Sequence, residues 1–160
     1  GRAPARGAAD CVRGLAVDLV ALATHEVMHL VALYAVGGTG SLVVRPWAFT
    51  FLPLTVDSLH AQAAAPLPFA AHLLFDFAGP ALAMLLLGIL TLAVGGRLAR
   101  SALVANLAIL AIYAVIEPLD VLLESAGQDA PLLTWAEFNY GVPLLILLAT
   151  SMLVARRAPG

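Results

Sequence analysis

Long apolar runs, separated by short polar or glycine- and proline-containing stretches, make up most of this chain. Four of these runs predict membrane-crossing helices, at about 15–36, 69–94, 102–119 and 141–155. The first three have about the 20 apolar residues that a helix needs to cross a bilayer, whereas the fourth is shorter. The pattern therefore predicts an all-α integral membrane protein, with about four transmembrane helices in a single membrane domain.

The stretch between the first two runs has a different pattern. Gly37, Gly38 and Gly40 stop the first predicted helix, since glycine readily closes a helix C-terminus. Residues 41–51 are rich in β-branched and aromatic side chains and too short to span, so they predict one or two short strands or a re-entrant hairpin. The proline-containing stretch that follows is predicted to be irregular, with His60 as a surface histidine rather than a metal ligand.

The composition supports a membrane location. Hydrophobic residues make up 62% of the chain and charged residues 11%, against about 45–50% and about 25% in ordinary soluble domains. A formal net charge of −2 gives no reason to expect a nucleic-acid partner. The single cysteine, Cys11, excludes an intrachain disulfide framework.

The basic residues are all arginines and are unevenly placed. With four crossings, both termini and the turn near residue 97 share one side of the membrane. Arg45 alone lies on the other side. The shared side holds seven arginines: Arg2, Arg6, Arg13, Arg97, Arg100, Arg156 and Arg157. Because cytoplasmic segments are enriched in arginine and lysine, this asymmetry predicts that both termini are cytoplasmic.

The first apolar run contains the sequence Thr-His-Glu-Val-Met-His at 24–29, an HExxH pattern. On a helix, His25 and His29 share one face, where their imidazoles can hold a zinc ion. Glu26 then lies beside them as a general base. The chain has only 4 His, and ionisable side chains inside an apolar run are costly, so this spacing favours a metal site over chance.

A catalytic zinc site typically has three protein ligands and one open position. The spacing of the predicted helices leaves four candidates for the third ligand within or beside the membrane. Helical rise per residue places more than one of them near the level of the HExxH motif, so depth does not decide among them. The candidates are His72, Asp76, Glu117 and Asp120.

The order of these features resembles the site-2 protease family of intramembrane zinc metalloproteases. The resemblance rests on the HExxH helix, the glycine-rich turn into short strands, Ala-Gly-Pro at 78–80 and Pro-Leu-Asp at 118–120. It covers roughly residues 24–120.

This resemblance implies that His25, His29 and Asp120 bind Zn2+ and that Glu26 is the catalytic base. The implied activity is cleavage of a transmembrane or membrane-associated protein substrate within the lipid bilayer, and the implied location is a bacterial inner membrane. We further expect residues 41–51 to pair edge-on with an extended substrate.

Two other interpretations remain open. In the first, the chain is a non-catalytic, protease-like subunit that packs against partner membrane subunits, with His25, His29 or His72 bonded to a haem or chlorophyll. Glu26 argues against it, because a pigment ligand needs no adjacent carboxylate. The second is a metal transporter, which we expect to have polar groups along a path through several helices, whereas here they gather at one level.

Overall fold

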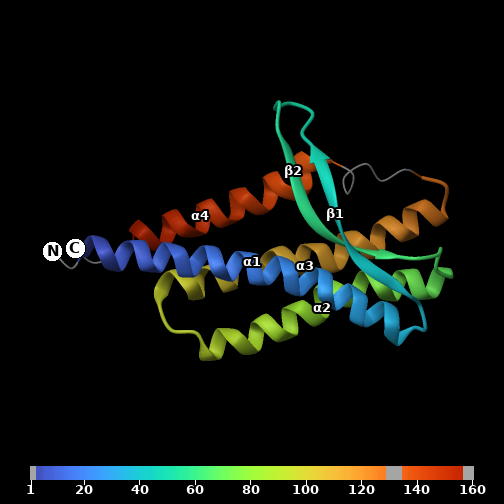
Figure 1. Cartoon of the computed structure of the whole chain (residues 1–160), viewed down its shortest axis with the longest axis horizontal. Helices are drawn as coiled ribbons and strands as arrows, with labels where there is room; N and C mark the ends of the chain where they lie inside the picture. Colours follow the sequence, from blue (N-terminus) through green and yellow to red (C-terminus); the bar gives the residue numbers. More distant parts are fainter. Residues whose placement is uncertain (1–2, 129–134, 157–160) are drawn as a thin grey trace.

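The computed structural model describes residues 3–128 and 135–156 (Figure 1). Helices dominate, and one two-stranded sheet follows the first helix, as the sequence predicts. The elements in chain order are α1 (Ala3–Ala35), β1 (Gly40–Ala48), β2 (Thr55–Ala63), α2 (Phe69–Ala93), α3 (Arg97–Ser125), the π-helical turn η2 (Glu137–Gly141) and α4 (Val142–Arg156).

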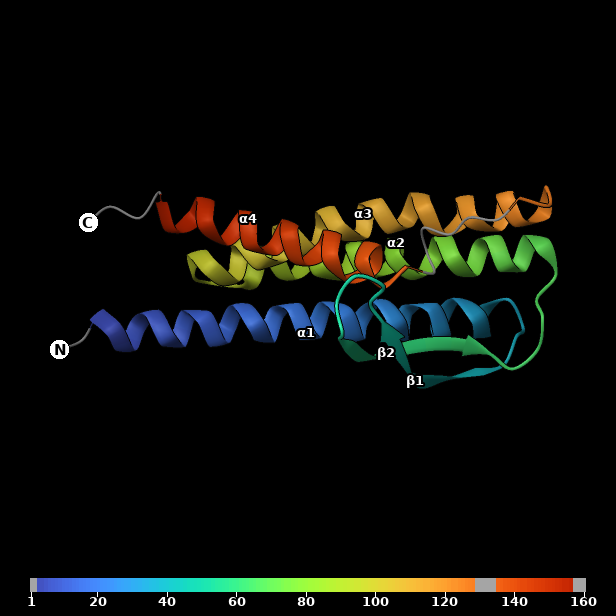
Figure 2. The same cartoon turned by 90° about the horizontal axis from the view of Figure 1, so that it is seen from above.

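The helices run alternately up and down the long axis. α2 packs against both α1 and α3, α1 also packs against α3, and α4 packs against α3. α4 starts part-way along the bundle, so its last residues, the start of α1 and the α2–α3 turn lie at the same end (Figures 1 and 2).

Three helical segments are long and apolar enough to cross a membrane by length and composition: 12–35, 69–93 and 97–125. Large apolar side chains face outward along them, including Leu92, which is 88% exposed, and Val115, which is 64% exposed. Residues 137–150 form a shorter apolar helix, in line with the shorter fourth run. The third helix continues past residue 119 to Ser125, because Pro118 is accommodated inside it.

β1 and β2 form an antiparallel hairpin in which Val43 pairs with His60 and Trp47 pairs with Val56. The strand predicted after the first helix is therefore present. The prediction that the following stretch is irregular was wrong for residues 55–63, which form β2. The register explains this, since all nine residues of β1 have a partner in β2. The hairpin lies along the C-terminal half of α1, and its tip crosses toward the start of α4 (Figure 2).

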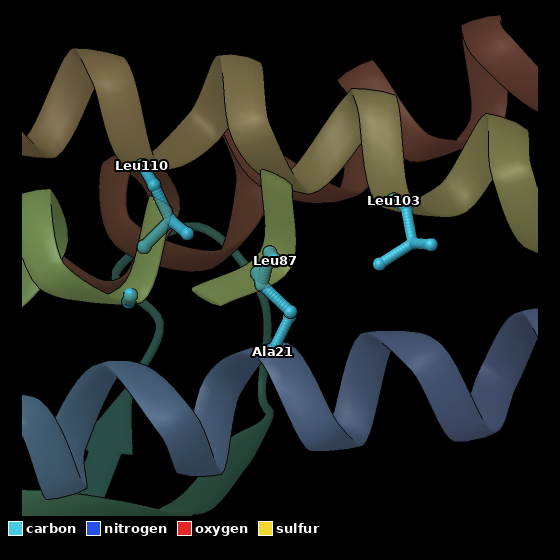
Figure 3. Close-up of a cluster of buried hydrophobic side chains, with 5 residues drawn as sticks. Ala21, Leu87, Leu103 and Leu110 are labelled. Carbon is cyan, nitrogen blue, oxygen red and sulfur yellow. The ribbon is translucent and has the colours of Figure 1, made fainter. Parts of the chain in front are cut away.

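Two buried clusters hold this arrangement together. In the first, Leu87 points from α2 toward Ala21 of α1, and Leu103 and Leu110 approach from α3 (Figure 3). Small residues such as Ala21 let neighbouring helices come close, which is how membrane helices typically pack. The second cluster joins Leu33 of α1, Ala61 of β2 and Phe75 of α2. It fixes the hairpin against the helices beside the HExxH motif.

Candidate metal centre

The two histidines of the HExxH motif meet one carboxylate from another helix. His25 and His29 are buried on α1, and their Nε2 atoms lie 3.0 Å apart. Glu117 of α3 places Oε1 3.4 Å from His25 Nε2 and Oε2 3.2 Å from His29 Nε2. One ligand atom from each of the three residues lies within 4.8 Å of the others, so this group can hold a metal ion.

A backbone carbonyl fixes the orientation of His29. Its Nδ1 lies 3.0 Å from the carbonyl oxygen of Phe75 in α2. Because a carbonyl oxygen only accepts, Nδ1 is the protonated nitrogen and donates, and the lone pair of Nε2 then faces His25 and Glu117. A ring nitrogen held in this way is typical of histidines that bind metals.

Gly79 provides the space that this ring needs. A Cβ atom at residue 79 would collide with the Cγ, Nδ1 and Cε1 atoms of His29. Gly79 and Pro80 are both buried inside α2. The Gly-Pro pair noted in the sequence therefore has a steric reason, because any larger side chain at 79 would displace His29.

The donor chemistry of this group fits a divalent cation such as zinc. Glu117 Oε2 is buried and has no hydrogen-bond donor among the described residues, although it lies 3.2 Å from His29 Nε2. The short distance and the missing hydrogen bond are compatible if His29 carries its proton on Nδ1, because Nε2 and Oε2 are then both acceptors. Two acceptors facing one another are unfavourable unless a cation lies between them. Imidazole nitrogens and a carboxylate oxygen are ligands that Zn2+ prefers.

Glu26 faces the hairpin rather than the other two helices. The backbone N–H of Ala61 in β2 donates to Glu26 Oε2 at 2.6 Å. Ala64 N bonds to Thr39 O and Phe49 N bonds to Leu54 O, so the odd-numbered residues of β2 turn their N–H groups away from β1. Ala61 is one of these, so the free edge of β2 holds one carboxylate oxygen of Glu26, and in the part of the chain that the structure describes the other oxygen has no hydrogen-bond partner.

His60, predicted to be a surface histidine, lies in the wall of the same site. Its Nδ1 is 3.8 Å from Glu26 Oε2, and its side chain is 39% exposed. Burial lowers the pKa of the His60 imidazole, while the nearby Glu26 carboxylate acts in the opposite direction. His60 is partly exposed and lies outside the converging metal-ligand group, in line with the prediction, but its ring lines the cavity beside the motif glutamate.

Asp120, the expected third ligand, is not part of the converging group. It lies three residues beyond Glu117 on α3, which moves it about 4.5 Å further along the helix axis. Of the other three candidates, His72 and Asp76 also lie outside the group and pair with each other on one helix at 3.5 Å, whereas Glu117 lies inside it. Glu117 therefore replaces Asp120 as the third candidate ligand.

The group lines a cavity of about 860 Å3 between the helices and the hairpin. At one end of the cavity Asn106 Nδ2 donates to Asp18 Oδ1 at 2.7 Å, and at the other end lie Asp120 and Glu124. Among the described residues α1 and α4 do not pack on each other, yet both line the cavity. The exposed apolar side chains of Leu22 and Leu144 lie on these two helices, so the cavity opens sideways between them.

Comparison with protein-family models, curated proteins and solved structures gives no match to this chain.

Some of the groups that shape this site carry little signal in the sequence. Phe75 and Ala61 act through backbone atoms, which any residue supplies, so only the fold shows them. His60 was visible as one of 4 His, but its strand was not predicted. Tyr113 lies one turn before Glu117, and its ring centroid is 5.6 Å from that of His25. In the sequence, only the four-residue spacing between Tyr113 and Glu117 indicated that Tyr113 could lie near the site.

Proposed function

We propose that this protein is an intramembrane zinc metalloprotease that cleaves a peptide bond of a membrane-embedded substrate. The observation that supports it is the convergence of His25, His29 and Glu117 within 4.8 Å, with Glu26 held beside them. All four residues line one cavity. A metal site with a carboxylate beside it is an arrangement that supports metal-assisted hydrolysis.

His25, His29 and Glu117 would hold the zinc ion. When bound there, zinc polarises a carbonyl group and makes a neighbouring water molecule more acidic. His29 Nδ1 keeps its proton and donates it in a hydrogen bond to the Phe75 carbonyl oxygen. Nε2 of His29 therefore remains available to the zinc ion throughout.

Glu26 carries the proton during hydrolysis. Its uncommitted oxygen takes one proton from the attacking water, whose oxygen bonds to the carbonyl carbon while the C=O π electrons move to the carbonyl oxygen. That pair then returns as the C–N bond breaks, and Glu26 gives its proton to the departing nitrogen. The products are a carboxylic acid and an amine. The Ala61 N–H keeps the other carboxylate oxygen in place during both transfers.

A substrate helix must unwind before cleavage, because its carbonyl groups are hydrogen-bonded within the helix. The free edge of β2 offers partners for the unwound segment. Leu59 and Ala61 line the cavity, and the backbone N–H and C=O groups of Leu59 point away from β1 and form no hydrogen bonds with it. An extended substrate would add to this edge as a further strand, next to Glu26. The sequence predicted edge pairing by residues 41–51, whereas the strand nearest the site is β2.

In this role the three long apolar helices would cross a bilayer, with α4 as a shorter fourth segment and both termini in the cytoplasm of a bacterial cell. The uneven distribution of arginines supports this orientation. The outward-facing apolar side chains support burial in lipid. The sideways opening between α1 and α4 would then admit a substrate from the membrane.

The test is a comparison of purified wild type with Glu26→Gln and His25→Ala. We expect wild type to bind zinc and to cleave a transmembrane reporter. Glu26→Gln should retain zinc and lose cleavage, because the amide cannot take a proton, whereas His25→Ala should lose both. A folded wild-type protein that binds no zinc would contradict the proposal and favour a non-catalytic membrane subunit.

A further inference from the structure

His60 stands beside the motif glutamate without being committed to it. Its Nδ1 faces Glu26 Oε2 at 3.8 Å, which is too long for a hydrogen bond. A carboxylate oxygen only accepts, so the tautomer of the neutral ring with its proton on Nδ1 would direct a donor toward Glu26. Among the described residues His60 Nδ1 has no hydrogen-bond partner, and it faces the space in which Glu26 would act.

The hairpin holds this donor on a rigid support. His60 pairs with Val43 in the middle of the β ladder, and the next residue, Ala61, is buried and bonded to Glu26. The same face of the sheet carries Arg45 and Ser58, which also line the cavity. His60 is thus fixed relative to Glu26 by neighbouring backbone, and its exposed fraction of 39% leaves the ring open to a substrate.

We propose that His60 is a catalytic residue that donates a hydrogen bond from Nδ1 to the carbonyl oxygen of the scissile peptide. The bond strengthens as negative charge develops on that oxygen, so it stabilises the transition state more than the bound substrate. The proton stays on His60 throughout, and Glu26 alone transfers one. This inference rests on the proposed function and assigns to the hairpin a direct part in the chemistry.

The experiment compares His60→Phe, which keeps a ring but removes the donor, with His60→Gln, which keeps a donor. His72→Phe is the matched control, because His72 also lines the cavity and is 40% exposed. We expect His60→Phe to lower kcat by roughly 10²–10³-fold, as loss of one such donor typically does, with KM and zinc content unchanged. We expect His60→Gln to recover part of this loss and His72→Phe to change kcat little.

Binding measurements separate this role from a structural one. A phosphinic peptide that mimics the tetrahedral intermediate should bind His60→Phe more weakly than wild type. The reporter itself should bind Glu26→Gln equally well with and without His60→Phe. Equal loss of both affinities, or an unchanged kcat in a folded His60→Phe variant, would overturn the assignment while leaving the protease proposal intact. A wild-type protein that neither binds zinc nor cleaves would overturn both.

Discussion

Two groups of histidine and carboxylate side chains line the same cavity, and only one of them converges. In the inner group, His25, His29 and Glu117 are nearly sealed from solvent, with side chains 7–15% exposed. In the outer group, His72 is 40% exposed and pairs with Asp76, one turn along its own helix. The i, i+4 pair on α2 places a possible donor beside an acceptor, so it needs no further partner. The inner group instead brings acceptor atoms together from α1 and α3, which favours a cation between them.

The inner group owes its geometry to backbone features that the outer group lacks. The Phe75 carbonyl orients His29, and Gly79 leaves space for the ring. The hairpin covers the motif and holds Glu26 through Ala61. Burial and orientation together, rather than the kinds of residue present, distinguish a candidate metal site from a pair of polar groups in a cavity wall.

The sharpest test of this comparison replaces a carboxylate by its amide, first in the inner group and then at a cavity residue outside that group. Glu117→Gln should lower zinc affinity by more than about 100-fold, beyond what loss of an indirect partner of a metal costs. The reason is that the amide removes the only carboxylate of the converging group. Asp120→Asn should change zinc affinity by less than about tenfold. Competition with a chelator of known affinity measures both.

The opposite result, in which Asp120→Asn loses zinc and Glu117→Gln keeps it, would return the third-ligand role to Asp120. The distinction between the two groups would then fail, because a residue outside the converging set would be the ligand. Circular dichroism of each variant checks that the helices are intact.

A smaller effect is expected from the glycine that makes room for His29. Gly79→Ala should lower zinc affinity by roughly 10–100-fold, the usual cost of disturbing a group that orients a metal ligand. Gly88→Ala is the matched control on the same helix, because a Cβ at 88 meets no atom within 4 Å. If both variants bind zinc like wild type, the recess at Gly79 does not position His29.

The sequence predicted the parts of the site that depend on local spacing. HExxH spacing puts two histidines on one helix face wherever the helix lies, and the hairpin followed from a short β-branched stretch after a glycine stop. The choice between Glu117 and Asp120 depends on the rotation of α3 about its axis, which a difference of three residues changes by about 60°. No feature of the apolar run fixes that rotation, since large apolar side chains occur on all its faces.

The hairpin shows a related limit. Residues 58–63 alternate polar and apolar side chains, a strand pattern that the prediction from sequence did not use. The alternation breaks between Asp57 and Ser58, and all nine residues pair with β1. The position of His60 beside Glu26 follows from that pairing. A prediction from sequence therefore missed the residue that we now assign to the chemistry.

The smallest expected effect concerns Asn106 and Asp18, a paired set of polar groups at the end of the cavity away from Asp120. Asn106 Nδ2 donates to Asp18 Oδ1 at 2.7 Å and to the Ala102 carbonyl at 2.9 Å, joining α3 to α1. Asn106→Leu should destabilise the fold by about 0.6–2 kcal/mol, as loss of an interhelical hydrogen bond in a membrane does, and should leave zinc affinity unchanged.

Asp18→Leu combined with Asn106→Leu should cost less than the sum of the single variants, because each single change leaves one polar group without its partner. Unfolding in mixed micelles with increasing denaturing detergent measures the three free energies. A large loss of zinc in Asn106→Leu would show instead that the Asp18–Asn106 pair and the metal-binding group are energetically coupled. The distinction between converging and paired polar groups would then be wrong.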